Sequence, residues 1–181
     1  MLYIVECTYA NPGSEEDWNE FYSREKLPAL VSVTGFSTSQ RFRALKPGCP
    51  VYLAIHTIKD ADVISSDEYR LKGGGNFSRW QEHITDWHRN LYECEGPAPA
   101  VSSDELLLLS ARPIGFIETG LGYRALEMQA SGLDKSPERR VAYVLARENA
   151  AQLAEIPGAY LYETLTPQLQ NPAKCHQRGK Q

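Results

Sequence analysis

Several side chains in the first third of this sequence have chemistry that suits a small-molecule site. His56 is a histidine, whose side chain titrates near neutrality, so it can act as a general acid or a general base. Lys26 and Arg41 are cations that can hold an anionic group of a substrate. Tyr22 precedes Lys26 by one helical turn, so the two side chains can point the same way. These residue types suit proton transfer on a small molecule, provided that the fold brings them together.

The first element that must position them is an amphipathic helix after residue 13. Ser14 can cap its N-terminus, and the acidic residues that follow suit the positive end of a helix dipole. One face carries three aromatic residues and a carboxylate at i, i+3, i+4 and i+7, namely Trp18, Phe21, Tyr22 and Glu25. Pro28 lacks a backbone donor, so we expect the helix to bend or pause near Lys26.

Strands are expected to carry the remaining polar groups. Residues 51–58 predict a strand with Val51, Leu53 and Ile55 on one face and Tyr52, Ala54 and His56 on the other. We expect the apolar face to meet the helices, which leaves Tyr52 and His56 facing the opposite side of the sheet.

The first strand, residues 2–9, is apolar on both faces apart from Glu6, which is typical of a strand in the middle of a covered sheet. Glu6 is expected to pair with Arg41 or Arg43 on a neighbouring strand. The alternative is that it supplies a polar group to a cavity.

The order of predicted elements in residues 1–96 is β-α-β-β-α-β, a ferredoxin-like unit. A proline-rich linker at residues 96–100 follows, and residues 101–170 predict a reduced second copy that lacks the first helix. Its expected strands cover residues 105–111, 122–130, 139–147 and 158–166, with a short helix at 149–156. Residues 171–181 are expected to be a loose tail. The fold class is therefore α+β, with tandem ferredoxin-like units and antiparallel sheets.

Composition narrows the class of partner. The chain has 181 residues, a net charge of −4 and no basic block, which argues against a nucleic-acid or membrane partner. No apolar run is long enough for a transmembrane helix, and no signal peptide is recognisable. The four cysteines are far apart in the sequence, which favours reduced thiols and a cytoplasmic location.

No motif predicts a metal, a phosphate loop or another cofactor. Gly73-Gly74-Gly75 lacks the Gly-Lys-Ser/Thr that follows in a phosphate loop and is expected to end a helix. His83 and His88 do not have the i, i+4 spacing of a helical metal site. The segment between Phe77 and His88 is better interpreted as the aromatic wall of a pocket, which includes Trp80, or as a helix-packing surface.

One run of motifs resembles a known family. Trp18-x-x-Phe21-Tyr22-x-x-x-Lys26-Leu27-Pro28, then Gly35-Phe36 and Arg41-Phe42-Arg43, resembles the first helix and second strand of the dimeric α/β-barrel superfamily, and especially EthD-like proteins. That family usually has a histidine where this chain has Lys26 and a proline where it has Thr34. The missing histidine weakens any transfer of histidine-based chemistry to position 26.

The resemblance implies a barrel in which ligands lie between the sheet and the first helix. Two antiparallel sheets can meet face to face and enclose a cavity. The two sheets come either from one chain or from two, and we expect a homodimer because the second copy lacks a covering helix. On this reading the substrate-binding residues are Tyr22, Lys26, Arg41, Tyr52 and Trp80, with His56 as the catalytic residue.

These observations predict a cofactor-independent enzyme that acts on a small aromatic or lactone-like metabolite. The expected reaction is an isomerisation, cyclisation or decarboxylation by proton transfer. A non-catalytic binding or accessory protein with the same cavity is the alternative. Haem binding, with His56 or His83 as the axial ligand, is a third candidate that no motif favours.

Overall fold

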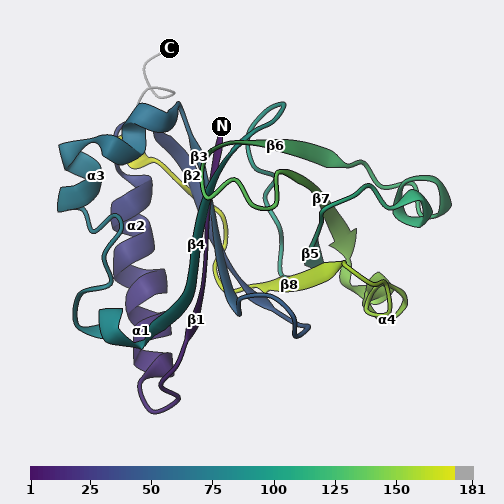
Figure 1. Ribbon diagram of the computed structural model, residues 1–181, viewed down its shortest axis with the longest axis horizontal. Helices are drawn as coiled ribbons and strands as arrows, with labels where there is room; N and C mark the ends of the chain where they lie inside the picture. The colour runs from purple at the N-terminus through teal and green to yellow at the C-terminus, as the bar shows by residue number, and fades with distance from the viewer. Residues whose placement is uncertain (174–181) are drawn as a thin grey trace.

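Antiparallel strands close into a barrel in the computed structural model, which describes residues 1–173 (Figure 1). The strands are β1 (Leu2–Tyr9), β2 (Phe36–Ala44), β3 (Tyr52–Ile58), β4 (Ile84–Glu93), β5 (Glu105–Ser110), β6 (Leu126–Leu133), β7 (Arg139–Ala146), β8 (Tyr160–Thr164) and β9 (Leu169–Gln170). Their order is β3-β1-β4-β6-β7-β5-β8-β2, and β2 pairs with β3 to close the ring. The short β9 pairs with β2 outside this ring. The barrel therefore closes within one chain, which the sequence had left open.

The two halves of the chain have the same spatial strand order. It is β2-β3-β1-β4 in the first half and β6-β7-β5-β8 in the second. The halves join along both edges, because β4 pairs with β6 and β2 pairs with β8. Since all these strands form one sheet, the division into units at residues 1–96 and 101–170 stays a prediction.

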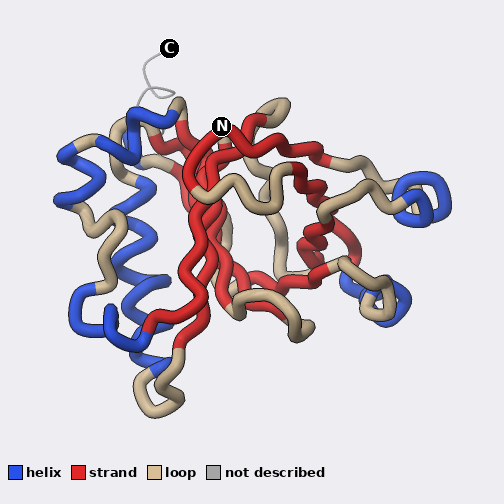
Figure 2. Tube along the Cα trace, viewed as in Figure 1, coloured by secondary structure: helices blue, strands red, loops and turns tan. Residues whose placement is uncertain are grey.

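The helical elements lie outside the barrel, mostly on one flank (Figure 2). Over the first half these elements are α1 (Glu15–Phe21), the π-helical turn η1 (Tyr22–Lys26), α2 (Leu27–Val31), η2 (Ala61–Ser65), α3 (Asp67–Leu71) and η3 (Ser78–His83). The second half has only η4 (Phe116–Gly120), η5 (Arg147–Asn149) and α4 (Ala150–Leu153) among the described residues. None of these helices is long and apolar enough to span a membrane.

The run from Glu15 to Val31 is one helix with a widened turn in its middle. The Leu27 N–H donates to the Tyr22 carbonyl, five residues back, and Pro28 follows with no N–H of its own. A π turn relieves the clash and the missing bond that proline brings to a helix interior. The expected pause near Lys26 is thus this turn. Ser14, in contrast, does not cap the helix; its hydroxyl bonds to the Tyr9 hydroxyl at 2.6 Å.

Strand alternation gives the barrel wall an inner and an outer face, and our prediction of which face meets the helices was wrong. Leu53 and Ile55 pack inside the barrel with Leu2, Ile4 and Phe42. Tyr52, Ala54 and the buried His56 lie on the helix side. The barrel interior is the more apolar environment, so the aliphatic face turns inward and the aromatic and polar face meets the helices.

Glu6 faces the barrel interior and pairs with Arg140 of β7, at 2.9 and 3.1 Å. The prediction of Arg41 or Arg43 as its partner was wrong, because Arg41 faces the helices and Arg43 pairs with Glu163. The pair joins the two halves across the barrel, a contact that sequence spacing does not reveal.

The first residue of the predicted loose tail, residues 171–181, is held in place in the structure. Asn171 is buried, and its side-chain amide donates to the carbonyls of Val33 and Phe36. These bonds hold the end of the described chain against the loop before β2. Residues 174–181 lie outside the described residues.

Candidate functional site

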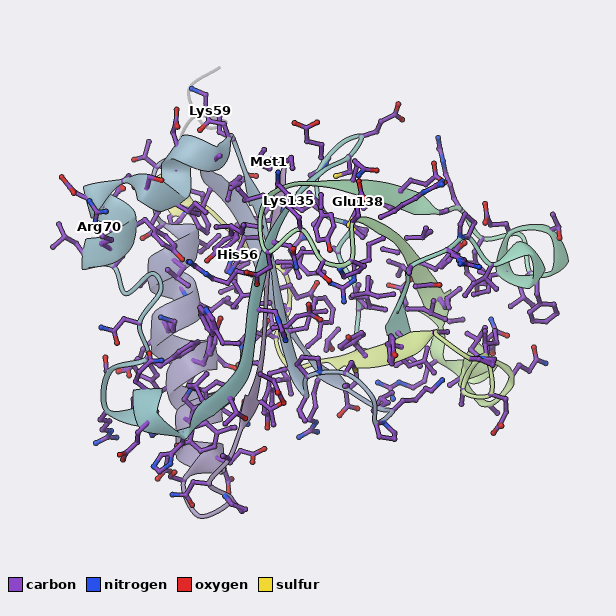
Figure 3. All side chains as sticks on the ribbon, in the orientation of Figure 1. Met1, His56, Lys59, Arg70, Lys135 and Glu138 are labelled. Atoms are coloured by element: carbon purple, nitrogen blue, oxygen red, sulfur yellow. The ribbon has the colours of Figure 1, made fainter. Side chains whose placement is uncertain are left out.

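A layer of aromatic and polar side chains fills the space between the outer face of β1–β4 and the helices that cover it. We call it the helix-side layer; its members include Tyr3, Cys7, Trp18, Tyr22, Lys26, Arg41, Tyr52, His56, Tyr69, Phe77 and Trp80. All six residues that the sequence singled out lie in this layer. Figure 3 shows His56 on the side of the strands that faces the helices.

Arg41 is a buried cation with hydrogen-bond partners but no carboxylate. Its guanidinium donates to Ser23 Oγ at 2.8 Å and to the side-chain and main-chain oxygens of Asn19 at 2.9 and 3.2 Å. It also lies 4.1 Å from the centre of the Tyr22 ring. Among the described residues no acid lies within salt-bridge distance. Burial lowers the pKa of Arg41 to about 10, so it remains charged at neutral pH.

Lys26 is the second buried cation, and it too contacts no carboxylate in the described part of the chain. Its ammonium donates to the carbonyls of Gly73 and Asn76 and lies 4.6 Å from the centre of the Phe77 ring. The π turn of η1 places it and Tyr22 inside the layer together. Burial lowers the pKa of Lys26 to about 8, so it is still mostly charged at neutral pH but loses its proton more readily than an exposed lysine.

His56 is completely buried between two rings. It stacks on Tyr3 with 5.6 Å between ring centres and meets the edge of Phe36 at 5.3 Å. Nδ1 lies 2.6 Å from Ser39 Oγ, whereas Nε2 has no hydrogen-bond partner among the described residues. Burial, with a smaller contribution from the Lys26 charge, lowers the pKa of His56 to about 3. The imidazole is therefore neutral at physiological pH.

Tyr52 and Trp80 lie at the margin of the layer. The Tyr52 hydroxyl bonds to Glu15 and accepts from Asn19 Nδ2 at 2.8 Å. Trp80 stacks on Phe21 with ring centres 4.5 Å apart, and the guanidinium of Arg79 lies 4.2 Å from its ring. These two side chains frame the cluster rather than stand at its centre.

The sequence interpretation missed several polar members of the layer. The Tyr3 hydroxyl bonds to the Tyr69 hydroxyl at 2.8 Å and accepts from Arg89 at 3.2 Å. Ser39 was missed because a serine on a strand has no signal of its own. Tyr3 could have been found, since it shares the period-2 face of β1 with Cys7. Burial raises the pKa of the Cys7 thiol to about 12, so this cysteine is not a nucleophile.

The layer is closed. The void beside Cys7, Tyr22 and Arg41 has no room for a water molecule. Inside the barrel, the cavity bounded by Leu2, Phe42 and Met128 measures about 10 Å³, roughly the space of one water. A wider open groove of about 940 Å³ runs between the end of β4 and the start of β6. A ligand of the helix-side layer must therefore displace part of its cover.

Comparison with known proteins identifies the fold. No protein-family model and no curated protein matches this chain. Its structure is similar to that of an anthrone oxidase-like protein, with a TM-score of 0.57, 11% identity, and coverage of 94% of this chain and 93% of that one. It is also similar to a "putative monooxygenase" from Fusobacterium nucleatum, with a TM-score of 0.55, 8% identity and 94% coverage of both chains. This chain is an α+β barrel.

At 8% and 11% identity, the structural similarity supports a shared fold and no conclusion about activity. It agrees with the small α+β barrel that the sequence resemblance implied. The narrower resemblance to EthD-like proteins stays a prediction. Among residues 1–173 no group of three histidine, cysteine or acidic side chains could hold a metal ion.

Proposed function

We propose that this protein is a cofactor-independent enzyme that binds a small aromatic molecule as its anion in the helix-side layer and catalyses a proton transfer on it. The observation that carries the proposal is a neutral, buried His56 near two buried cations. Among residues 1–173, its Nε2 has no hydrogen-bond partner and neither cation pairs with a carboxylate. Such convergence of perturbed groups is typical of functional sites.

The two cations supply the anion-binding function. Lys26 and Arg41 are both in contact with the Tyr22 ring, at 5.9 and 4.1 Å from its centre. Burying two cations without a counter-charge is costly, and a bound phenolate or enolate would offset that cost. The aromatic rings of Trp18 and Phe77 suit a flat, apolar ligand body.

The cover of the layer offers a route of entry. Lys26 holds the loop after α3 through the carbonyls of Gly73 and Asn76, and Phe77 closes the layer over Tyr22. An anion that takes the Lys26 ammonium competes with those carbonyls. We propose that ligand entry releases this loop.

Oxidation by dioxygen is a second candidate reaction, favoured by the anthrone oxidase-like neighbour. An anthrone-type ring methylene would lose two hydrogens and gain one oxygen atom, and the second oxygen atom would leave as water. The proton that is lost first would pass to solvent as the substrate anion forms, and Lys26 and Arg41 would stabilise that anion. Isomerisation, cyclisation and decarboxylation remain proposals on the same grounds, and a non-catalytic binding or accessory protein is the alternative.

Haem does not fit these residues. An axial histidine must present a free nitrogen to a haem-sized space, and His56 is enclosed by Tyr3 and Phe36. His83 lies at the edge of the layer, with Nε2 3.4 Å from Glu82. In the described part of the chain, neither histidine lines any of the five cavities and grooves that were found.

Binding of salicylate and of anthrone tests the proposal. It can be followed by the tryptophan fluorescence of the protein, to which Trp18 contributes together with Trp80 and Trp87. Lys26→Ala should weaken salicylate binding at least about tenfold, since a charge-assisted bond is lost, and Lys26→Arg should retain part of the affinity. The exposed Lys59→Ala is the matched control and should bind as the parent does. Equal affinity for the parent and Lys26→Ala would refute the anion site.

Turnover is a separate measurement. With anthrone as the probe, oxygen consumption and the change in absorbance report oxidation. His56→Gln keeps a side-chain N–H donor for the ligand oxygen, so it should reduce the rate while salicylate still binds. Binding without any turnover of a panel of phenols and aromatic ketones would favour the accessory protein.

We also propose that the two halves are tandem copies of a ferredoxin-like unit and that the protein is a cytoplasmic homodimer. The repeated strand order supports the tandem copy. Light scattering at micromolar concentration tests the dimer, and a monomer mass would contradict it.

A further inference from the structure

Ser39 and His56 face each other on neighbouring strands of the barrel. They are register partners in the β2–β3 pairing, and both side chains are fully buried. Their contact joins Ser39 Oγ to His56 Nδ1 at 2.6 Å. Either atom can be the donor, and the choice decides which nitrogen of a neutral imidazole carries the proton.

Two observations and one general property of these groups indicate that the serine is the donor. A separation of 2.6 Å is short for an N–H donor, whose bonds centre near 2.9–3.0 Å, and suits an O–H donor. An unprotonated imidazole nitrogen is a stronger acceptor than a hydroxyl oxygen. In the described part of the chain Ser39 Oγ has no other hydrogen-bond partner, so no other acceptor is available for its hydroxyl hydrogen.

We infer that Ser39 donates to His56 Nδ1 and thereby fixes His56 as the Nε2–H tautomer, a neutral hydrogen-bond donor to the oxygen of a bound ligand. The inference rests on the proposed function for the ligand, but the tautomer itself does not. Nε2–H is buried without a partner among the described residues, and an unpaired buried donor is costly. A carbonyl or phenolate oxygen would satisfy it.

The role of His56 changes with this assignment. Its Nδ1 lone pair is occupied by Ser39 and its Nε2 already carries a proton, so it cannot accept a proton from the substrate while this bond persists. It stabilises negative charge that develops on the ligand oxygen, as donors in oxyanion holes do. Ser39 is a positioning residue, since it acts through His56. The ligand class is then a molecule with an oxygen acceptor next to the ionising ring.

Long-range ¹H–¹⁵N NMR of the labelled full chain tests the tautomer directly. His56 is identified by its contacts to the rings of Tyr3 and Phe36. We expect Nδ1 to appear as an unprotonated nitrogen and Nε2 as a protonated one at pH 7. A protonated Nδ1 would overturn the inference, and this measurement needs no variant to fold.

Variants separate positioning from packing. Ser39→Ala should shift His56 toward a mixture of tautomers and weaken salicylate binding by about tenfold, the effect of one lost hydrogen bond. Ser39→Thr keeps the hydroxyl and should restore both the Nε2–H tautomer and the affinity. An unchanged tautomer in Ser39→Ala would overturn the inference.

Failure of the proposed function gives a different result. If Nδ1 is unprotonated but neither salicylate nor anthrone shifts the Nε2 resonance, the tautomer assignment stands and the aromatic ligand is wrong. If a probe binds and Nδ1 proves to be protonated, the proposed function stands and the donor role of His56 is wrong.

Discussion

The two outer faces of the barrel have the same strand order beneath them but opposite chemistry. The helix-side layer of the first half buries the cations Lys26 and Arg41 and the neutral His56. The equivalent layer of the second half, which we call the second-half layer, is built from Leu106, Leu108, Ile117, Val141, Tyr143, Leu145, Leu153, Ala159 and Leu161. None of the charged side chains that are buried in residues 1–173 belongs to it.

The covering elements explain the difference. The first half is covered by the helical run from Glu15 to Val31 and by α3, η3 and the loop between them. Asn19 of the helical run partners Arg41, and the carbonyls of Gly73 and Asn76 in that loop partner Lys26. Within residues 1–173, the second half is covered only by short turns around η4 and α4. A thin cover supplies few hydrogen-bond partners, so an apolar layer is the stable arrangement there. The comparison therefore indicates that the position of the candidate site is determined by the elements that cover the sheet and not by the strand order.

The largest expected effect comes from breaking the Glu6–Arg140 ion pair, which links the two halves. Glu6→Gln leaves Arg140 charged and unpaired inside the barrel, which should lower the free energy of unfolding by about 3–5 kcal/mol. Urea unfolding measured by fluorescence and by circular dichroism checks this value. The free energy of unfolding should fall for both halves at once, because the ion pair joins β1 of the first half to β7 of the second.

The double variant Glu6→Leu/Arg140→Met is the control for that experiment. Replacing both partners of a buried ion pair with apolar residues is often neutral or stabilising, so most of the stability should return. If Glu6→Gln alone costs less than about 1 kcal/mol, the pair does not join the halves energetically.

The comparison also shows how far sequence reasoning reached. The face of the first helix, its interruption near Lys26 and the barrel fold follow from local spacing, from Pro28 and from the motif resemblance. The inward face of β3 was assigned wrongly, because alternation separates two faces without saying which meets the helices. The Glu6–Arg140 pair joins residues far apart in the sequence. Such contacts depend on barrel closure, and nothing in the spacing of the two residues encodes it.

The second prediction tests how tightly the helix-side layer is packed. A Cβ added at Gly74 would lie 2.3 Å from atoms of the Tyr69 ring, which the Tyr3 hydroxyl holds in place. Gly74→Ala should therefore cost about 1–3 kcal/mol, a typical cost of overpacking. Chemical denaturation gives the value. In a Tyr69→Leu background the same substitution should cost much less, and an equal cost would mean that the clash is not its cause.

The third prediction concerns acid sensitivity, which His56 should give to the first half. Its pKa is about 3 in the folded protein against 6.5 ordinarily. As pH falls below 6.5 the unfolded chain takes up a proton that the folded protein does not, so stability falls until about pH 3. One such proton corresponds to about 1.4 kcal/mol per pH unit at most.

The measurement is the difference in unfolding free energy between the parent and His56→Gln from pH 7 to pH 4. The variant should lose the slope that is due to this one proton, whereas the exposed His88→Gln should keep it. An unchanged slope in His56→Gln would show that the imidazole is protonated in the folded state.

The smallest expected effect comes from a substitution in the cover of the second-half layer. Gly115 precedes η4 with helical backbone angles of φ −57° and ψ −36°, and a Cβ added there would meet nothing within 4 Å. Alanine fits this conformation and restricts the unfolded chain, so Gly115→Ala should stabilise the protein by about 0.4–1 kcal/mol. Thermal and urea unfolding of Gly115→Ala beside Gly74→Ala compares the two covers directly. The same substitution should thus have opposite signs over the two layers, because one cover is packed against rigid rings and the other has free space. A loss of stability at Gly115 would mean that the second-half cover is packed as tightly as the first.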